Sequence, residues 1–250
     1  MRRAAAAGAL LVAVSSCFTV PITGRKSLNL LTPQQEVEVG TQYYQDMLAE
    51  EQPVRSGPEA DRVERVMQRL VAVADAPDYP WEVTLIRNDS TANAFALPGG
   101  KMAVYTGILP VTQDEAGLAA VMGHEIGHVI ARHGAERLTT EGLAENLLAL
   151  ARAHWGGSPE VYQAGKTVLL TLPYGRKQEL EADHIGLILM ARAGYDPRRA
   201  VDFWQRMAAQ SKGSPPEFLS THPSGATRIA DLKKLLPEAL EVHRRSGARP

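Results

Sequence analysis

Two histidines and a glutamate stand at the spacing of a zinc site between Val121 and Ile130. His124 and His128 are four residues apart. On a helix that turns about 100° per residue they lie about 40° apart, so both can point a ring nitrogen at one ion. Glu125 lies on the adjacent flank, where it can reach a water at the metal without being a ligand. The pattern predicts one Zn²⁺ per chain, with Glu125 as catalytic base.

The residues around this motif are apolar, which separates a metal site from a solvated helix face. Buried ionisable groups are costly unless they are paired or bind metal. Three of them together therefore favour a site over a satisfied polar core. The apolar neighbours are Leu118, Ala119, Ala120, Val121, Met122, Ile126, Val129 and Ile130.

A second segment supplies the remaining ligand. A catalytic zinc needs three protein ligands, and two histidines with one glutamate leave the fourth position open. Glu179 and Asp183 share one face of a helix that we expect from residue 176 to about 194. We expect Glu179 to bind the metal, and Asp183 either to orient a ligand or to hold a proton near the reacting centre. Arg176, one turn earlier, is expected to pair with a carboxylate or to contact substrate, whereas Glu181 is expected to face water.

The other histidines are expected outside the metal site, with one exception. His133 lies nine residues after His124, and a continuous helix would point it about 180° away. We therefore expect His133, His154, His184 and His243 to be structural or on the surface.

His222 is the exception, because it precedes Pro223 in a loop and a loop histidine can move. It could stabilise the oxyanion, with Tyr174 or Arg176 as lesser alternatives. It could instead occupy the open metal position and exclude water, or cap the helix that follows. All three readings remain open from the sequence.

The N-terminus has the features of an export signal. Arg2 and Arg3 precede an apolar stretch at residues 4–14, and small residues then lead to Cys17. This ending resembles a bacterial lipobox, and Cys17 is the only cysteine. We expect residues 1–16 to be removed, Cys17 to carry lipid, and no intramolecular disulfide to form. The alternative is a plain secretory signal followed by a free thiol.

The positioning elements predict one mostly helical α+β domain at residues 32–250, after a lipidated tether at residues 17–31. The chain is 44% hydrophobic and 22% charged with a formal net charge of -1, so its total charge gives no sign of a nucleic-acid partner. Thr32 with Gln35 predicts a capped helix to about Glu50, and a second helix is expected around residues 63–71.

The segment around the zinc helix combines strands with a helix cap. Alternation between residues 81 and 105 predicts a small antiparallel sheet. An extended substrate could add to it by backbone hydrogen bonds near Asn93 and Ala94, although a plain β-meander is the alternative. Thr112 is expected to cap the zinc helix, which should continue past Arg137.

Four ordered motifs resemble one group of metallopeptidases. They are His-Glu-Ile-Gly-His, Glu-Leu-Glu-Ala-Asp, Asn-Ala-Phe-Ala-Leu-Pro-Gly-Gly and Ser-Thr-His-Pro. Over about residues 20–236 the chain is similar to the HtpX-type and CAAX prenyl proteases, nearest to the periplasmic branch of lipoprotein and β-barrel-assembly-enhancing proteases. The resemblance implies a gluzincin fold with zinc on His124, His128 and Glu179. It also implies that Glu125 is the base and Asp183 the proton donor.

The expected function is zinc-dependent endopeptidase activity in a bacterial cell envelope. The lipid anchor would be the only membrane attachment, on the periplasmic side, and Phe18 after the cysteine favours the outer membrane. Misfolded or stalled envelope proteins are the expected substrates, and envelope assembly machinery an expected partner. Neither membrane-spanning helices nor a helical repeat array after residue 236 is expected. The alternative is a non-catalytic, chaperone-like lipoprotein with a structural zinc, which would not need Glu125 as a base.

Overall fold

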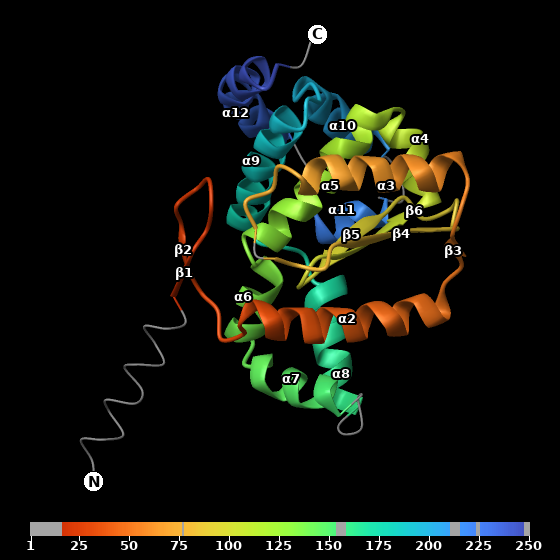
Figure 1. Cartoon of the computed structure of the whole chain (residues 1–250), viewed down its shortest axis with the longest axis vertical. Helices are drawn as coiled ribbons and strands as arrows, with labels where there is room; N and C mark the ends of the chain where they lie inside the picture. Colours follow the sequence, from red (N-terminus) through yellow and green to blue (C-terminus); the bar gives the residue numbers. More distant parts are fainter. Residues whose placement is uncertain (1–16, 77, 154–158, 211–215, 224–225, 248–250) are drawn as a thin grey trace, which may run out of the picture.

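Two long helices lie side by side at the centre of the fold and carry the two main motifs (Figure 1). The computed structural model describes residues 17–76, 78–153, 159–210, 216–223 and 226–247. Helix α5 (Glu115–Ile130) packs against α9 (Arg176–Arg192) at glycines. A Cβ atom at Gly127 would lie 2.7 Å from the carbonyl oxygen of Ala182, and one at Gly186 would lie 2.9 Å from the backbone nitrogen of His124. Side chains larger than hydrogen would therefore push the two motifs apart.

Helix α5 is shorter than the sequence predicted. Its N-cap is Asp114, whose carboxylate accepts the N–H of Gly117, whereas Thr112 ends the short helix α4 (Leu109–Thr112). The expectation that the helix continues past Arg137 is wrong. Arg132 has a left-handed φ of 57°, so the chain turns and starts a separate helix, α6 (His133–Thr140). Residue spacing beyond Ile130 therefore does not follow the geometry of α5.

A four-stranded sheet lies between α2 on one side and α3 and α5 on the other (Figure 1). The strands run in the order β3-β4-β6-β5. The sheet was expected to be antiparallel, but β4 and β6 are parallel. The chain passes through the edge strand β5 before it returns as β6 between β5 and β4, which gives β6 the direction of β4. The strands are β3 (Pro53–Val54), β4 (Glu82–Ile86), β5 (Ala94–Leu97) and β6 (Lys101–Tyr105).

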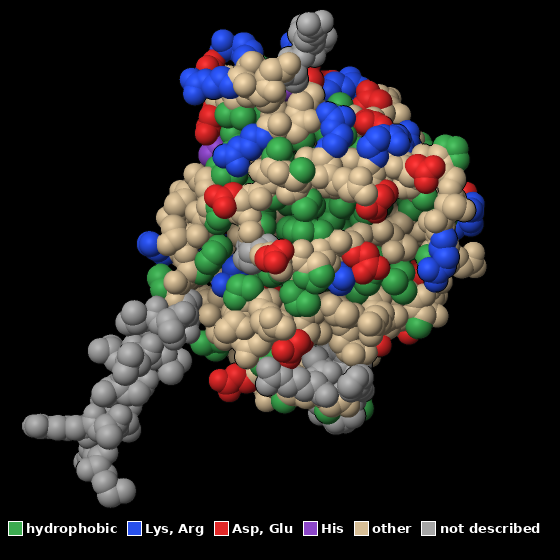
Figure 2. Space-filling model, in the orientation of Figure 1, with side chains coloured by type: hydrophobic (Ala, Val, Ile, Leu, Met, Phe, Trp, Pro, Cys, Tyr) green, Lys and Arg blue, Asp and Glu red, His purple; other side chains and the backbone are tan. Residues whose placement is uncertain are grey.

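Of the remaining helices, some cover the sheet and the helix pair and others pack against α2. Thr32 caps α2 by accepting the N–H of Gln35, whose side chain in turn accepts the N–H of Thr32, so the predicted capping box is confirmed. Hydrophobic side chains gather on the surface between α2 and α3 (Figure 2). The helices are α2 (Pro33–Glu50), α3 (Pro58–Val71), α7 (Ala144–Arg152), α8 (Pro159–Lys166), α10 (Arg198–Ala209), α11 (Glu217–Thr221) and α12 (Ala226–Arg245), with a 3₁₀ turn at Thr106–Ile108 and a π-helical turn at Thr167–Thr171.

The expected tether is a β-hairpin. Strand β1 (Cys17–Thr19) pairs antiparallel with β2 (Lys26–Leu28), and Cys17 lies opposite Leu28. The hairpin projects from the side of the fold (Figure 1). The predicted signal peptide lies outside the described residues. Within the described part of the chain, no helix has both the length and the apolar character needed to cross a bilayer.

Candidate metal centre

Four buried side chains bring one ligand atom each to a common point. His124 and His128 come from α5, Glu179 from α9 and His222 from the residues after α11. Nε2 of His124 is 3.1 Å from Nε2 of His128 and 3.2 Å from Nδ1 of His222. Oε1 of Glu179 is 3.0 Å from Nδ1 of His222 and 3.3 Å from Nε2 of His128. Ligand atoms on a tetrahedral zinc ion lie about 3.4 Å apart, so the four side chains fit one such ion.

The protonation of these groups also suits a metal. Burial lowers the pKa of His124 to about 4 and holds that of His128 well below its usual value, so each ring keeps a lone pair for a cation. Burial by itself raises the pKa of Glu179, but His222 and Arg228 outweigh it and hold the pKa well below its usual value. His124 and His128 are therefore neutral imidazoles near pH 7, and Glu179 is an ionised carboxylate.

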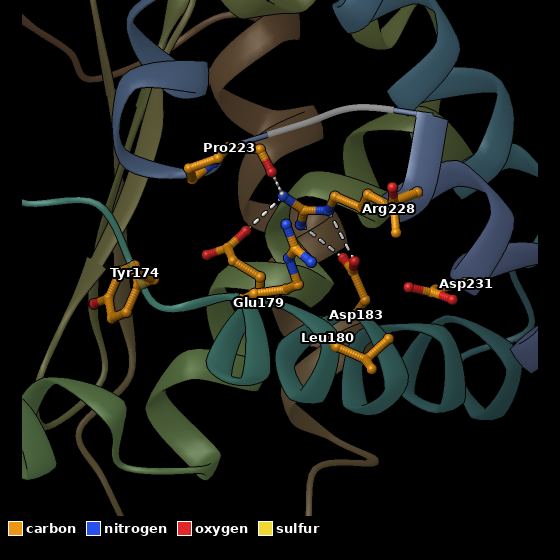
Figure 3. A pocket seen from close by; sticks show the side chains of 9 residues that line it. Tyr174, Glu179, Leu180, Asp183, Pro223, Arg228 and Asp231 are labelled. Carbon is orange, nitrogen blue, oxygen red and sulfur yellow. Dashed lines mark hydrogen bonds and ion pairs between the residues drawn. The ribbon is translucent and has the colours of Figure 1, made fainter.

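Arg228 of α12 is the buried cation that balances the acidic side of the site. Its guanidinium donates to both carboxylate oxygens of Asp183, at 2.8 and 2.7 Å, and to Oε2 of Glu179 (Figure 3). It also stacks on Trp204, 3.4 Å from the ring centroid. The sequence did not single out Arg228. The one hint in the sequence is that Arg228 follows His222 by six residues. The sequence contains many arginines, and nothing in it shows that this one is buried.

Asp183 lies behind the ligand His124. Its Oδ1 is 3.0 Å from Nδ1 of His124, which leaves Nε2 of that ring directed at the metal position. Burial by itself raises the pKa of Asp183, but the charge of Arg228 and the contact with His124 hold it below its usual value. An ionised carboxylate has no proton to give, so these contacts fit the orienting role and disfavour the proton-donor role implied by the resemblance.

Glu125 is held at one oxygen and free at the other. Oε2 accepts the backbone N–H of Ala96 in strand β5 at 3.1 Å. Oε1 is buried and has no hydrogen-bond partner among the described residues, and Nε2 of His222 lies 3.4 Å from it. Burial raises the pKa of Glu125 to about 7. A carboxylate with this pKa can accept and return a proton near neutral pH.

A cavity of about 340 Å³ lies between α9 and α12, and Glu179 is the one candidate ligand among its lining residues. Tyr174, Glu179, Asp183 and Arg228 line it, with Arg176 among its exposed lining residues (Figure 3). This position keeps Arg176 available to a substrate.

Asn93 and Ala94, the other two residues expected to bind substrate, do not line this cavity. They are buried at the start of β5, where Oδ1 of Asn93 has no hydrogen-bond partner among the described residues. Substrate binding along β5 therefore remains a prediction. The nearest polar link from this strand to the metal centre is the N–H of Ala96 on Glu125.

Tyr174 forms part of the aromatic wall beside the metal position. Its ring centroid lies 4.0 Å from that of His128 and 5.4 Å from that of His222. Phe218 contacts the other side of His222, with ring centroids 4.6 Å apart. His222 is therefore held in place by rings and by Glu179, and it occupies the position next to the two α5 ligands.

Comparison with known proteins gives a family match and several relatives. Residues 58–236 match the model of peptidase family M48. The chain is 40% identical over 225 residues to the mitochondrial metalloendopeptidase OMA1 of Schizosaccharomyces pombe, covering 88% of this chain and 66% of the relative. It is 31% identical over 251 residues to the human metalloendopeptidase OMA1, with coverage of 92% and 48%.

A bacterial relative is also matched. The β-barrel assembly-enhancing protease of Escherichia coli is 31% identical over 237 residues, covering 87% of this chain and 47% of that protein. The expected metallopeptidase relationship is thus confirmed. The mitochondrial relatives were not anticipated. The chain spans about half to two thirds of the length of these three relatives.

Replacing Arg228 should destabilise the protein. Arg228→Leu leaves the buried carboxylates of Glu179 and Asp183 without their counter-charge, which typically costs about 3–5 kcal/mol. Urea unfolding of the metal-free protein measures this change. Arg245→Leu is the matched control, because Arg245 is on the same helix but pairs with Glu241 at the surface. Equal stabilities of the two variants would contradict the balancing role of Arg228.

Proposed function

Since the chain belongs to peptidase family M48, we propose that it is a zinc metalloendopeptidase with the metal on His124, His128 and Glu179. The observation that carries the proposal is the position of Glu125 beside this ligand group, with one buried oxygen that has no hydrogen-bond partner among the described residues. Four ligand atoms within 4.8 Å of one another make room for a single ion.

The side chains around the metal position divide the chemical work. Bound zinc supplies a Lewis acid that activates water and polarises a carbonyl. The N–H of Ala96 holds Oε2 of Glu125, which leaves Oε1 to accept a proton and later return it to the leaving amine. Asp183 accepts from Nδ1 of His124 and so fixes its ring, and Arg228 holds that carboxylate in place. Glu125 therefore acts as base and then as acid, and Asp183 acts by orientation.

The alternative is a non-catalytic lipoprotein with a structural zinc. His222 favours it to some extent, because a fourth protein ligand closes the coordination as in structural sites. Glu125 argues against it, because a structural site has no use for a buried carboxylate whose pKa is raised to about 7. We therefore propose that His222 is a ligand that must leave the metal before turnover. An enzyme of this kind accounts for both His222 and Glu125.

Substituting Glu125 and Glu179 should separate catalysis from metal binding. Glu125→Gln keeps the volume of the side chain and should retain zinc while losing turnover. Glu179→Ala removes a ligand and should lose zinc. Metal content by atomic absorption and cleavage of casein measure the two properties. If Glu125→Gln lost as much zinc as Glu179→Ala, the division between base and ligand would be wrong.

Replacing His222 should reveal whether it blocks the metal. As a blocking ligand, His222→Ala should increase proteolysis, including self-cleavage. As an oxyanion donor it should instead lower turnover by about 10²-fold or more. Casein cleavage and the rate of self-cleavage, normalised to bound zinc, distinguish the two. Activity within about twofold of wild type, with unchanged zinc affinity, would remove His222 from the site.

The finer proposal is a lipid-anchored envelope protease. We propose attachment to the periplasmic side of the outer membrane, with misfolded or stalled envelope proteins as substrates. The name of the E. coli relative, a β-barrel assembly-enhancing protease, supports an envelope role. Because other relatives are mitochondrial by name, the compartment rests mainly on the lipobox-like segment before Cys17.

The hairpin geometry supports attachment at Cys17. This residue is exposed and lies opposite Leu28. Leu28 and Leu30 are 50% and 41% exposed, while Ser27 and Asn29, which alternate with them, are buried. This reversal of the usual alternation puts the leucines on the outside, beside the position of the acyl chains. Contact with lipid would remove these side chains from water.

Replacing Cys17 should release the protein from membranes. Cys17→Ser, expressed in a Gram-negative host, has no thiol for lipid attachment and should move from the membrane fraction to the soluble fraction. Fractionation followed by immunodetection measures the distribution, with Ser246→Ala as a control remote in sequence. Unchanged membrane association of the Cys17 variant would refute the lipid anchor.

A further inference from the structure

A chain of polar contacts leads from the ligand His128 to the N-terminal hairpin. Nδ1 of His128 lies 2.9 Å from Nδ1 of His133, and Nε2 of His133 lies 2.9 Å from Oε2 of Glu181. At the far end, Arg25 donates to Oε2 of Glu181 at 2.6 Å and the hydroxyl of Thr23 donates to Oε1 at 2.5 Å. The contacts join segments that are more than 100 residues apart in the sequence.

Two residues in this series of contacts lie where the sequence did not predict them. Glu181 was expected to face water, but it is 7% exposed. His133 was expected to be structural, which agrees with its exposure of 0%, but it was also expected to point away from the zinc ligands. The left-handed turn at Arg132 ends α5 and folds His133 back onto His128. Both residues are thus placed behind the metal position.

These contacts show which ring nitrogens of His133 and His128 carry a hydrogen. Glu181 receives hydrogen bonds from Arg25 and Thr23, so it is a carboxylate and Nε2 of His133 must donate to it. In a neutral ring Nδ1 of His133 is then the acceptor, so Nδ1 of His128 carries a hydrogen. The remaining nitrogen of His128, Nε2, keeps its lone pair and is the atom directed at the metal.

We propose that His133, Glu181 and Arg25 are positioning residues that fix the ring orientation and tautomer of the zinc ligand His128. Carboxylate partners commonly do this for metal-binding histidines directly, and here a second histidine is inserted between the ligand and the carboxylate. The proposal rests on the zinc site of the proposed function. It extends that site to the hairpin, which precedes the residues matched by the family model.

The hairpin can support His128 because ion pairs of Arg25 hold it against α6 and α9. Arg25 grips Glu181 and also donates to both oxygens of Glu136 on α6, at 2.7 and 3.0 Å. One guanidinium therefore ties α6, which carries His133, to α9, which carries Glu181. Displacing the hairpin would loosen both elements. The same hairpin begins at Cys17, so the proposed anchor and the zinc ligand share one support.

Zinc affinity tests the proposal independently of proteolysis. Glu181→Gln removes the charge that fixes the proton on His133, and loss of such partners typically weakens metal binding about 10–100-fold. Competition with a chromophoric chelator gives the dissociation constant. Absorption of the Co²⁺-substituted protein reports ligand geometry. Arg25→Gln, a half-exposed site, should shift affinity in the same direction by a smaller factor.

Glu238→Gln is the matched control. Glu238 accepts from Nε2 of His184, another α9 residue, at 2.8 Å, and neither residue belongs to the four-ligand group. This variant should keep zinc affinity within about twofold of wild type and an unchanged Co²⁺ spectrum. Thermal unfolding of the metal-free proteins shows whether any variant has lost its fold. Arg25→Gln provides the result if Glu181→Gln does not fold.

The outcomes separate this inference from the proposed function. Folded Glu181→Gln and Arg25→Gln proteins with wild-type zinc affinity and Co²⁺ spectra would overturn the positioning role, even if wild type is an active protease. Weakened affinity in both variants supports the role, even if wild type binds zinc without cleaving casein. A wild-type protein that binds no zinc would overturn both.

Discussion

The structure depends on how charged groups are accommodated between α5 and α9. Glycines bring the backbones of the two helices close together, so Glu125, Glu179 and Asp183 lie in the interior. A buried charge is costly unless it is paired or coordinated. Arg228 pairs with two of these carboxylates, those of Asp183 and Glu179. Glu179 also contributes a ligand atom to the metal position. The C-terminal helix α12 is therefore as much a part of the site as the two motif helices.

Each α5 ligand has its own support from a distant segment. Asp183 with Arg228 lies behind His124, and His133 with Glu181 lies behind His128. Both arrangements leave the Nε2 atoms directed at one point. A metal ligand that is already oriented loses less entropy on binding. The fold thus prepares the site from both sides, through α12 on one and the N-terminal hairpin on the other.

His222 decides whether the fourth position at the metal centre is closed or open. It lies among the ligands and is packed between the rings of Tyr174 and Phe218. Burial by itself lowers its pKa, but the carboxylates of Glu125 and Glu179 hold the pKa above its usual value. The short segment at residues 217–223 carries His222, so the fourth position would open only if this segment moved.

The sequence by itself determined the local parts of this protein. Local helix geometry explains three correct predictions. They are the common face of His124 and His128, the capping box at Thr32 and the helix that carries Glu179. The tertiary structure decided what depends on the path between elements. It made β4 and β6 parallel, returned His133 to His128 through the turn at Arg132, and buried Glu181. Side-chain partners across more than 100 residues, such as Arg25 with Glu181, leave no periodic pattern in the sequence. Only packing shows them.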